Sequence, residues 1–424
     1  MQKFFLGAGA VLIAGSSLFF FSPKFTRVIQ ILENRPHSSL SEIKENIADK
    51  KIPLADIEPQ PQLQNPPTVI KAVYATNWSA GNSKSIEKLI QLIKETEINA
   101  IVIDIKDYTG VVGYRTDLEL VGKYGAEENR IPFINRLLKR LHDENIYVIG
   151  RIAVFEDQAL ATSRPELSLK SLATGKSWRT RNGLLWLDAT SREVWDYNLA
   201  IAADALRRGF DEINLDYIRF PSDGNLEDIS YPFWDKQVPR REVIKNFFAY
   251  VREKLPNAIL SADLFGLVTI NTDDLGIGQY LEYALPYFDY VSPMTYPSHY
   301  NKGFLGYDEP SKYPYEVVKN SMQNAVDRQK KFTDQNIGKI NRVAKIRPWL
   351  QDFSLGVHYT HDLVQAQMRG VADVFTSCIP GVNPAGETKP SSPCASQLSE
   401  DYSGWMLWSP SNVYTREALT AETP

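Results

Sequence analysis

The stretch GFDEINLDYIRFP, residues 209–221, reads as a buried strand that ends in a turn and a proline. Because successive side chains of an extended chain point to opposite faces, we expect one face to carry Ile213, Leu215 and Tyr217 and the other to carry Asn214, Asp216 and Ile218. Aspartate is depleted in strands and is rarely buried without a partner. Asp216 is therefore predicted to have a functional use beside Arg219, the alternative being an aspartate satisfied by a loop or by Arg219 itself.

Outward from this strand, short apolar runs alternate with helical patterns, which is typical of βα units around a parallel sheet. Helices are predicted at 85–97, 131–144, 192–208 and 240–255. The predicted strands are 69–78, 100–107, 147–155, the opening stretch, 258–268, 290–297, 345–353 and 404–410. Eight strands with mostly intervening helices predict the α/β class and a closed (β/α)8 TIM barrel.

Polar and aromatic side chains gather at the predicted C-terminal strand ends, where such barrels carry their chemistry. The opposite strand ends show no comparable cluster. Paired carboxylates beside aromatic rings are the usual equipment of glycoside hydrolysis, so Asp216 and Asp263, from adjacent strands, are the predicted catalytic pair. The predicted substrate-binding residues are Asp104, Lys106, Asp107, Arg151, Asp157, Arg219, Tyr296, His299, Trp349, Asp352 and Trp408.

Chitinase-type barrels carry Asp-x-x-Asp-x-Asp-x-Glu on their fourth strand, and Asp211, Asn214 and Asp216 resemble its first three positions. Ile218 stands where the catalytic glutamate would be. The chain is therefore not expected to use that residue for substrate-assisted cleavage of N-acetyl sugars.

A second resemblance covers about residues 69–410 and rests on IVIDIKDYTGVVGY, LWLDATSREVWDY, GFDEINLDYIRFP, SADLFG, PMTYPSHY and PWLQDF. In these motifs the chain resembles the putative glycoside hydrolase (TIM-barrel) domain family of bacterial and archaeal exported proteins. The resemblance implies a glycosidase-like barrel without specifying a substrate. Its motif residues correspond here to Asp104, Lys106, Asp107, Asp188, Asp216, Arg219, Asp263, Tyr296, Trp349 and Asp352, although Asp188 could instead position the helix that starts near Arg192.

Other function classes lack their signatures. A formal charge of −4 without a Lys/Arg-rich run argues against nucleic acid as a partner. The five histidines form neither HxH nor HExxH, and no phosphate-binding or dinucleotide-binding glycine motif is present. No cofactor is expected, and calcium on Asp223 and Asp228 is left open.

The first residues predict a membrane association. An apolar run at 4–21 is flanked by cations and favours a signal anchor over a cleaved signal peptide. We expect segment 1–22 as anchor or signal, 23–67 as a proline-rich linker and 68–416 as the barrel, exported to the cell envelope and monomeric. A disulfide between Cys378 and Cys394 would suit that oxidising space.

Two functions from different classes follow from these expectations. The first is a glycosidase acting on an envelope or extracellular polysaccharide. The second is an anchored glycan-binding barrel without turnover. A third and weaker possibility is a structural envelope protein, whose rim carboxylates would pair with one another and leave no open groove.

Overall fold

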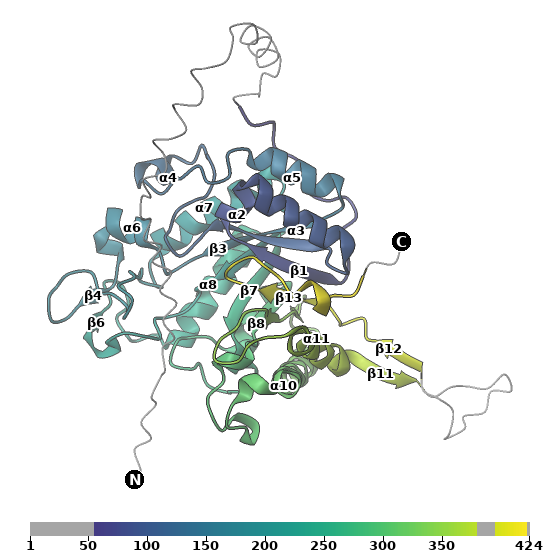
Figure 1. Ribbon diagram of the computed structural model, residues 1–424. Helices are drawn as coiled ribbons and strands as arrows, with labels where there is room; N and C mark the ends of the chain where they lie inside the picture. The colour runs from purple at the N-terminus through teal and green to yellow at the C-terminus, as the bar shows by residue number, and fades with distance from the viewer. Residues whose placement is uncertain (1–54, 380–394, 422–424) are drawn as a thin grey trace, which may run out of the picture. The chain divides into compact units, whose positions relative to one another are not determined.

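The computed structural model describes residues 55–379 and 395–421, and from Asp56 onward these residues form one compact unit. Its main sheet is parallel throughout and runs in the order β10-β13-β1-β2-β3-β5-β7-β8-β9. Met294 of β8 also pairs with Trp349 of β10, which closes the sheet into a barrel (Figure 1). Its strands are β1 (Ile70–Ala75), β2 (Ala100–Lys106), β3 (Tyr147–Ala153), β5 (Glu212–Asp216), β7 (Ile259–Phe265), β8 (Tyr290–Met294), β9 (Lys345–Ile346), β10 (Trp349–Gln351) and β13 (Gly404–Trp408).

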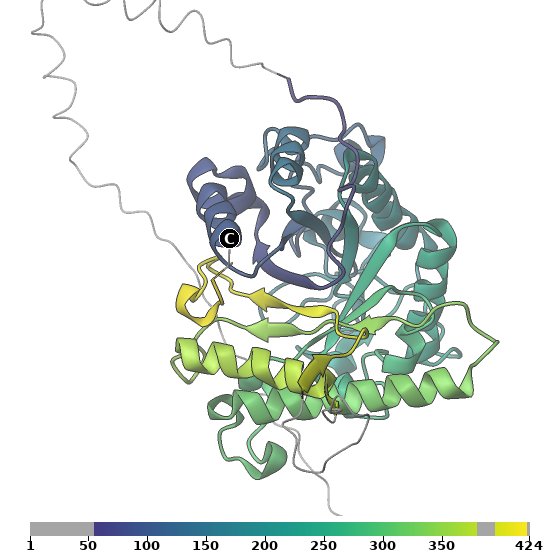
Figure 2. The same ribbon diagram turned by 90° about the vertical axis from the view of Figure 1, so that its right-hand side faces the viewer.

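The predicted (β/α)8 barrel is confirmed, with β9 and β10 as two segments of the predicted seventh strand, separated by Arg347 and Pro348. Long helices follow most strands, and α10 and α11 pack side by side (Figure 2). They are α3 (Ser83–Glu95), α5 (Ile134–Asp143), α7 (Arg192–Arg208), α8 (Arg240–Lys254), α10 (Pro314–Gln335) and α11 (His361–Phe375). Shorter pieces are α2 (Asn77–Gly81), α4 (Glu119–Lys123), α6 (Gln158–Ser163), α9 (Leu281–Ala284) and the two-stranded pairs β4 (Lys170–Ser171) with β6 (Ile229–Ser230) and β11 (Thr376–Ile379) with β12 (Ala395–Leu398).

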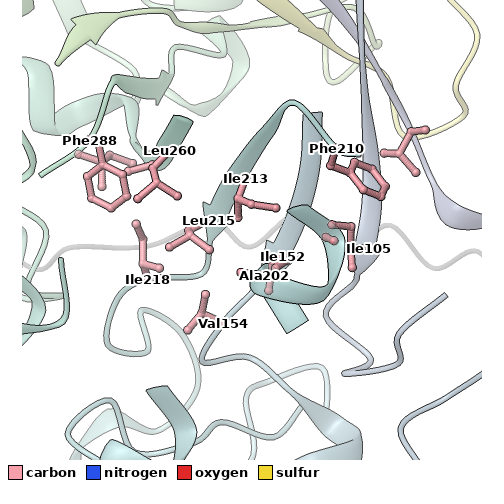
Figure 3. Packing of buried hydrophobic residues seen from close by; sticks show 14 of the residues in the cluster. Ile105, Ile152, Val154, Ala202, Phe210, Ile213, Leu215, Ile218, Leu260 and Phe288 are labelled. Atoms are coloured by element: carbon pink, nitrogen blue, oxygen red, sulfur yellow. The ribbon is translucent and has the colours of Figure 1, made fainter. Parts of the chain in front are cut away.

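Helix α7 shows how local sequence delivers the decisive strand. The Ser191 side chain caps its first turn, and Gly209, in the left-handed region at φ 110°, ends it. Ala202 on its inner face packs near Ile213 and Leu215 of β5 in the layer between barrel and helices (Figure 3). The apolar side of β5 thus faces the helices, and its polar side faces the barrel interior.

The barrel interior also holds a group of polar side chains near the start of β5, which the sequence analysis did not predict. Arg347 and Glu212 form a fully buried ion pair, and Tyr147 donates a hydrogen bond to Glu212 over 3.3 Å. The Arg347 guanidinium also lies 4.0 Å from the centre of the Tyr290 ring. The expectation of no polar cluster toward the N-terminal strand ends was therefore wrong, because these residues stand on different strands and meet only in the closed barrel.

Residues 56–63, here called the N-terminal strap, bind the barrel at the N-terminal side of β5. The backbone N–H of Gln60 donates to Arg208 O over 3.0 Å, and that of Leu63 donates to the Asp211 carboxylate over 2.7 Å. Asp56 accepts from the N–H of Asn135 over 2.8 Å at the start of α5. Part of the stretch predicted as linker is thus hydrogen-bonded to the barrel.

Other predictions for the termini lie outside the described residues. Segment 4–21 and Cys394 are among the residues whose structure is not described, as is the side chain of Cys378. No helix within residues 55–379 and 395–421 is long and apolar enough to cross a membrane. The anchor and the disulfide stay predictions.

Candidate active site

Strand β5 ends in a backbone break that shapes the site. Tyr217 has φ 54°, a left-handed conformation that costs a non-glycine residue energy and is often found at functional sites. The predicted alternation of faces stops there. Ile218 is buried in the apolar layer near Leu260 and Phe288 (Figure 3), whereas Tyr217 turns to a cavity.

The cavity has a volume of about 370 Å³ and lies at the C-terminal ends of β5, β7 and β8. It is therefore at the end of the barrel where enzymes of this fold carry their chemistry. Asp216 and Arg219 face it rather than open solvent. Its lining residues are Asp216, Tyr217, Arg219, Phe265, Gly266, Leu267, Met294, Tyr296, His299 and Tyr300.

Arg151, from the middle of β3, joins three carboxyl groups. Its Nη1 lies 2.6 Å from Asp104 Oδ1, and its Nη2 lies 2.5 Å from Asp216 Oδ2. Its Nε lies 3.8 Å from Asp263 Oδ2, too long for a hydrogen bond, and finds no such partner in the described part of the chain. Asp216 is therefore paired by Arg151 and not by Arg219, the partner that the sequence reading left open.

Asp263 is the most enclosed of these acids, with only 1% of its surface exposed. Its Oδ1 accepts hydrogen bonds of 2.8 Å from Asn214 Nδ2 and from Trp349 Nε1. Burial, reinforced by the negative charge of Asp216, raises the pKa of Asp263 to about 8. At neutral pH this side chain is a protonated acid beside Asp216.

An aromatic wall stands beside Arg151. The rings of Tyr74 and Trp408 stack at 3.9 Å, and the Tyr74 hydroxyl donates to Asp104 over 2.5 Å. The Arg151 guanidinium lies 5.1 Å from the centre of the Trp408 ring. These contacts fix the guanidinium in place, and Arg151 is buried.

Two further predicted residues, Tyr296 and His299, line the same cavity as Asp216. Their rings meet edge to face at 5.3 Å. Partial desolvation by the surrounding side chains lowers the pKa of His299, although the residue is exposed at the rim of the cavity, so the neutral imidazole prevails at pH 7. A neutral imidazole both donates and accepts, which suits a sugar hydroxyl.

Lys106 and Asp157, both predicted to bind substrate, lie elsewhere. They form an ion pair of 2.5 Å with no exposed side-chain surface, and Asp157 also caps α6 by accepting from Leu160 N. The cause is an irregular pairing of β2 with β3 between Asp104 and Lys106, a β-bulge that places these two residues on different sides of the barrel wall. Neither the Lys106 nor the Asp157 side chain lines the cavity.

Asp107 and Asp352 are held by loop contacts. Asp107 pairs with Arg130 over 2.6 Å, and Asp352 accepts from Thr415 N and Oγ1 over 2.8 and 2.7 Å. Asp188 is buried and accepts from the backbone of Phe233 and Trp234, so it fastens the loop after β5 and the helix cap is left to Ser191. These geometries are those of structural carboxylates.

Glu156 was assigned no role from the sequence. It follows β3 and is 5% exposed, and burial raises its pKa to about 7. Tyr74 and Asn214, which hold Asp104 and Asp263, went unassigned as well. The signal for Asn214 was its place two residues before Asp216, on the same face of β5.

Metal ligands do not gather here. Within the described ranges, no group of three or more His, Cys, Asp or Glu side chains is arranged to hold a metal ion. Asp228, one of the two residues considered for calcium, accepts a hydrogen bond of 2.8 Å from Ala173 N.

The fold and the acid-rich mouth define a TIM barrel of the glycoside hydrolase type. Residues 72–379 match the family model described as "Putative glycosyl hydrolase domain", and the chain belongs to that family. The family resemblance predicted from the motifs is thereby confirmed, and the chain is classed as a glycosidase with its substrate unspecified.

Among the solved structures similar to this chain, the PgaB (BpsB) domain, with a TM-score above 0.5, shows the same fold. A hypothetical protein from Ruminiclostridium thermocellum ATCC 27405 is 40% identical, over 48% of this chain and 98% of that chain, with a TM-score of 0.43. The PgaB (BpsB) glycoside hydrolase domain from Bordetella bronchiseptica is 13% identical, over 84% of this chain and all (100%) of that one, with a TM-score of 0.53. TtGalA, an α-galactosidase from Thermus thermophilus, is 14% identical over 85% and 65%, with a TM-score of 0.45. No curated protein matches the sequence.

Proposed function

We propose that the protein hydrolyses glycosidic bonds of an envelope or extracellular polysaccharide at the cavity beside Asp216. The observation that carries this proposal is the Arg151 guanidinium, which gathers Asp104 and Asp216 within ion-pair distance and lies beside Asp263. Glycosidases need two carboxyl groups in different protonation states across one bond. Here Asp216 is ion-paired with Arg151, and the pKa of the neighbouring Asp263 is raised.

Asp216 is assigned as nucleophile or electrostatic stabiliser. Asp216 lines the cavity. Its two carboxylate oxygens are oriented by hydrogen bonds from Arg151 Nη2 and from the backbone N–H of Tyr217. Asp263 is assigned as general acid/base, since a carboxyl that keeps its proton at neutral pH can protonate a leaving oxygen. Aromatic rings of the lining, such as Tyr217 and Phe265, would stack on sugar C–H surfaces.

A glycan-binding barrel without turnover is the second candidate, and one observation favours it. Asp263 is 1% exposed and does not line the cavity that Asp216 lines. A general acid must come within hydrogen-bond reach of the leaving oxygen, directly or through one water. If Asp263 stays enclosed when glycan binds, the site would hold sugar and not cleave it.

Location is proposed together with function. The apolar segment 4–21 would anchor the protein as a monomer, with its barrel exported to the envelope. Export is supported by the sequence of that segment.

The test uses the full-length protein and a panel of envelope and extracellular polysaccharides, with release of reducing ends as readout. Asp216→Asn should lower turnover by at least about 10²-fold and leave glycan binding intact. Asp308→Asn, on a side chain that is 88% exposed, is the control and should keep full turnover. Unchanged turnover in Asp216→Asn would remove the role given to Asp216, and binding without turnover by the unaltered protein would establish the second candidate.

A further inference from the structure

Arg219 lies in the cavity wall with donors to spare. Its Nη1 donates to Phe220 O over 3.2 Å and to Ser222 Oγ over 3.0 Å. Its Nε and Nη2 find no hydrogen-bond partner in the described part of the chain. Because the residue lines the cavity, this unused edge of the guanidinium is available to a ligand.

The Arg219 charge is also unmatched at close range. Arg151 and Arg347 form ion pairs with carboxylates inside the barrel. Arg219 forms none within 4.0 Å across the described residues, although Glu156, Asp216 and Asp223 act on it from farther away. Burial lowers its pKa, so its charge is held there at a cost that a bound anion would offset.

Three aromatic rings fix the plane of this guanidinium. Its central carbon lies 4.7 Å from the ring centre of Phe265, 4.8 Å from that of Trp186 and 5.5 Å from that of Tyr217. A guanidinium clamped in this way loses little rotational freedom when a ligand binds. A fixed planar edge selects for a planar partner.

We propose that the cavity is a subsite for an acidic sugar, a uronic acid unit of the glycan, whose carboxylate binds Arg219. The inference rests on the proposed function and names its substrate class. The Nε–H and one Nη2–H of a guanidinium point in parallel, which matches the two oxygens of a carboxylate. Among the described residues Asp216 forms no hydrogen bond with this edge, and its oxygens accept from Arg151 and from Tyr217 N instead.

The rest of the lining fits the body of such a sugar. Leu267 and Met294 present apolar surface to ring C–H groups, and Tyr296 and His299 present hydrogen-bonding groups to hydroxyls. The volume of about 370 Å³ is near the lower end of the range for small-molecule sites. The subsite would therefore admit a short piece of a glycan and place its acidic unit beside Asp216.

The experiment is a calorimetric titration of the full-length protein with D-glucuronate and D-galacturonate against D-glucose and D-galactose. The uronates should bind at least about tenfold more tightly than their neutral counterparts, since hydrogen bonds to charged groups are the strong ones. Arg219→Met should abolish this preference, and Arg219→Lys should restore only part of it. Arg240→Met is the matched control, because Arg240 also lies over two aromatic rings, those of Phe220 and Trp234, but outside the cavity lining.

Equal binding of neutral and acidic sugars would overturn the inference, as would a uronate preference that survives in Arg219→Met. Inorganic sulfate or phosphate competing as well as glucuronate would also overturn it, by showing a general anion site. The outcome is separable from that of the proposed function, because Asp216→Asn should keep the uronate preference. Uronate binding without glycan turnover would refute the hydrolase alone, and turnover of neutral glycans only would refute the acidic subsite alone.

Discussion

The residue that organises the site is Arg151, which the sequence reading placed among the substrate-binding groups. Its guanidinium forms ion pairs with Asp104 and Asp216 and lies beside the Trp408 ring. These contacts leave the guanidinium no surface for a sugar. Arg151 donates a hydrogen bond to the Asp216 carboxylate and orients it. We therefore propose Arg151 as a positioning residue, whereas Asp216 and Arg219 line the cavity.

Asp263 gives a pH prediction. Aspartate in an unfolded chain has a pKa of about 3.9, whereas in the folded protein the pKa of Asp263 is raised to about 8. Between these values the folded protein keeps a proton that the unfolded chain has released. This contribution to stability is therefore complete below pH 4, falls as pH rises by at most about 1.4 kcal/mol per unit, and is gone above about pH 8.

Urea unfolding from pH 4 to pH 9 checks this prediction against Asp263→Asn, which cannot titrate. The stability of the wild type relative to the variant should decline over that range and level off above about pH 8. Glycan turnover by the wild type should fall along the same alkaline limb, as expected for loss of a general acid. A constant difference between the two proteins would show that Asp263 is ionised throughout.

At the scale of elements, the sequence predicted each barrel strand, because buried parallel strands are continuous apolar runs with turn residues at their ends. The sequence did not predict side-chain contacts that depend on how one strand pairs with another. The irregularity between Asp104 and Lys106 arises from the match of β2 to β3, so Lys106 was expected in the site although it pairs with Asp157 outside the cavity. Arg347 and Glu212 are 135 residues apart, and their ion pair could not be read from local pattern.

Strand β13 closes onto β1 through Gly404, which has φ 87°. A Cβ at this position would lie 2.0 Å from Ile70 O, a backbone atom that cannot give way. Gly404→Ala should therefore destabilise the barrel by more than the roughly 1–2 kcal/mol that a left-handed backbone alone costs. Chemical unfolding measures the difference.

Gly338 supplies the control for that substitution. Its φ is 72° and a Cβ there would meet nothing within 4 Å. Gly338→Ala should show the backbone cost without the steric one. Equal losses in both variants would mean that β13 adjusts freely and that the close approach to Ile70 does not constrain closure.

At the scale of the whole molecule, the N-terminal strap predicts where the folding unit begins. Chains that start at Asp56 should match the full chain in stability, because the strap keeps its bonds to Arg208, Asp211 and Asn135. Chains that start at Thr68 should be less stable by a few kcal/mol, at about 0.5–1.5 kcal/mol per hydrogen bond lost. Thermal unfolding of the two truncated chains tests this prediction. Equal unfolding midpoints would mean that all of residues 23–67 act as a linker.

Two of the buried ion pairs, those of Glu212 with Arg347 and of Asp216 with Arg151, have a consequence for how the chain avoids misfolding. Glu212, Asn214 and Asp216 occupy alternate positions of β5 and bind Arg347, Asp263 and Arg151. A slip of one residue along either neighbour would turn all three toward the apolar helix layer, leaving Arg347 without its carboxylate partner and Arg151 with Asp104 as its only close one. The side chains that form the proposed site thereby also discriminate against competing strand registers. Variants at Asp216 or Arg151 that are made to alter specificity are therefore expected to include barrels with misregistered strands as well as altered catalysts.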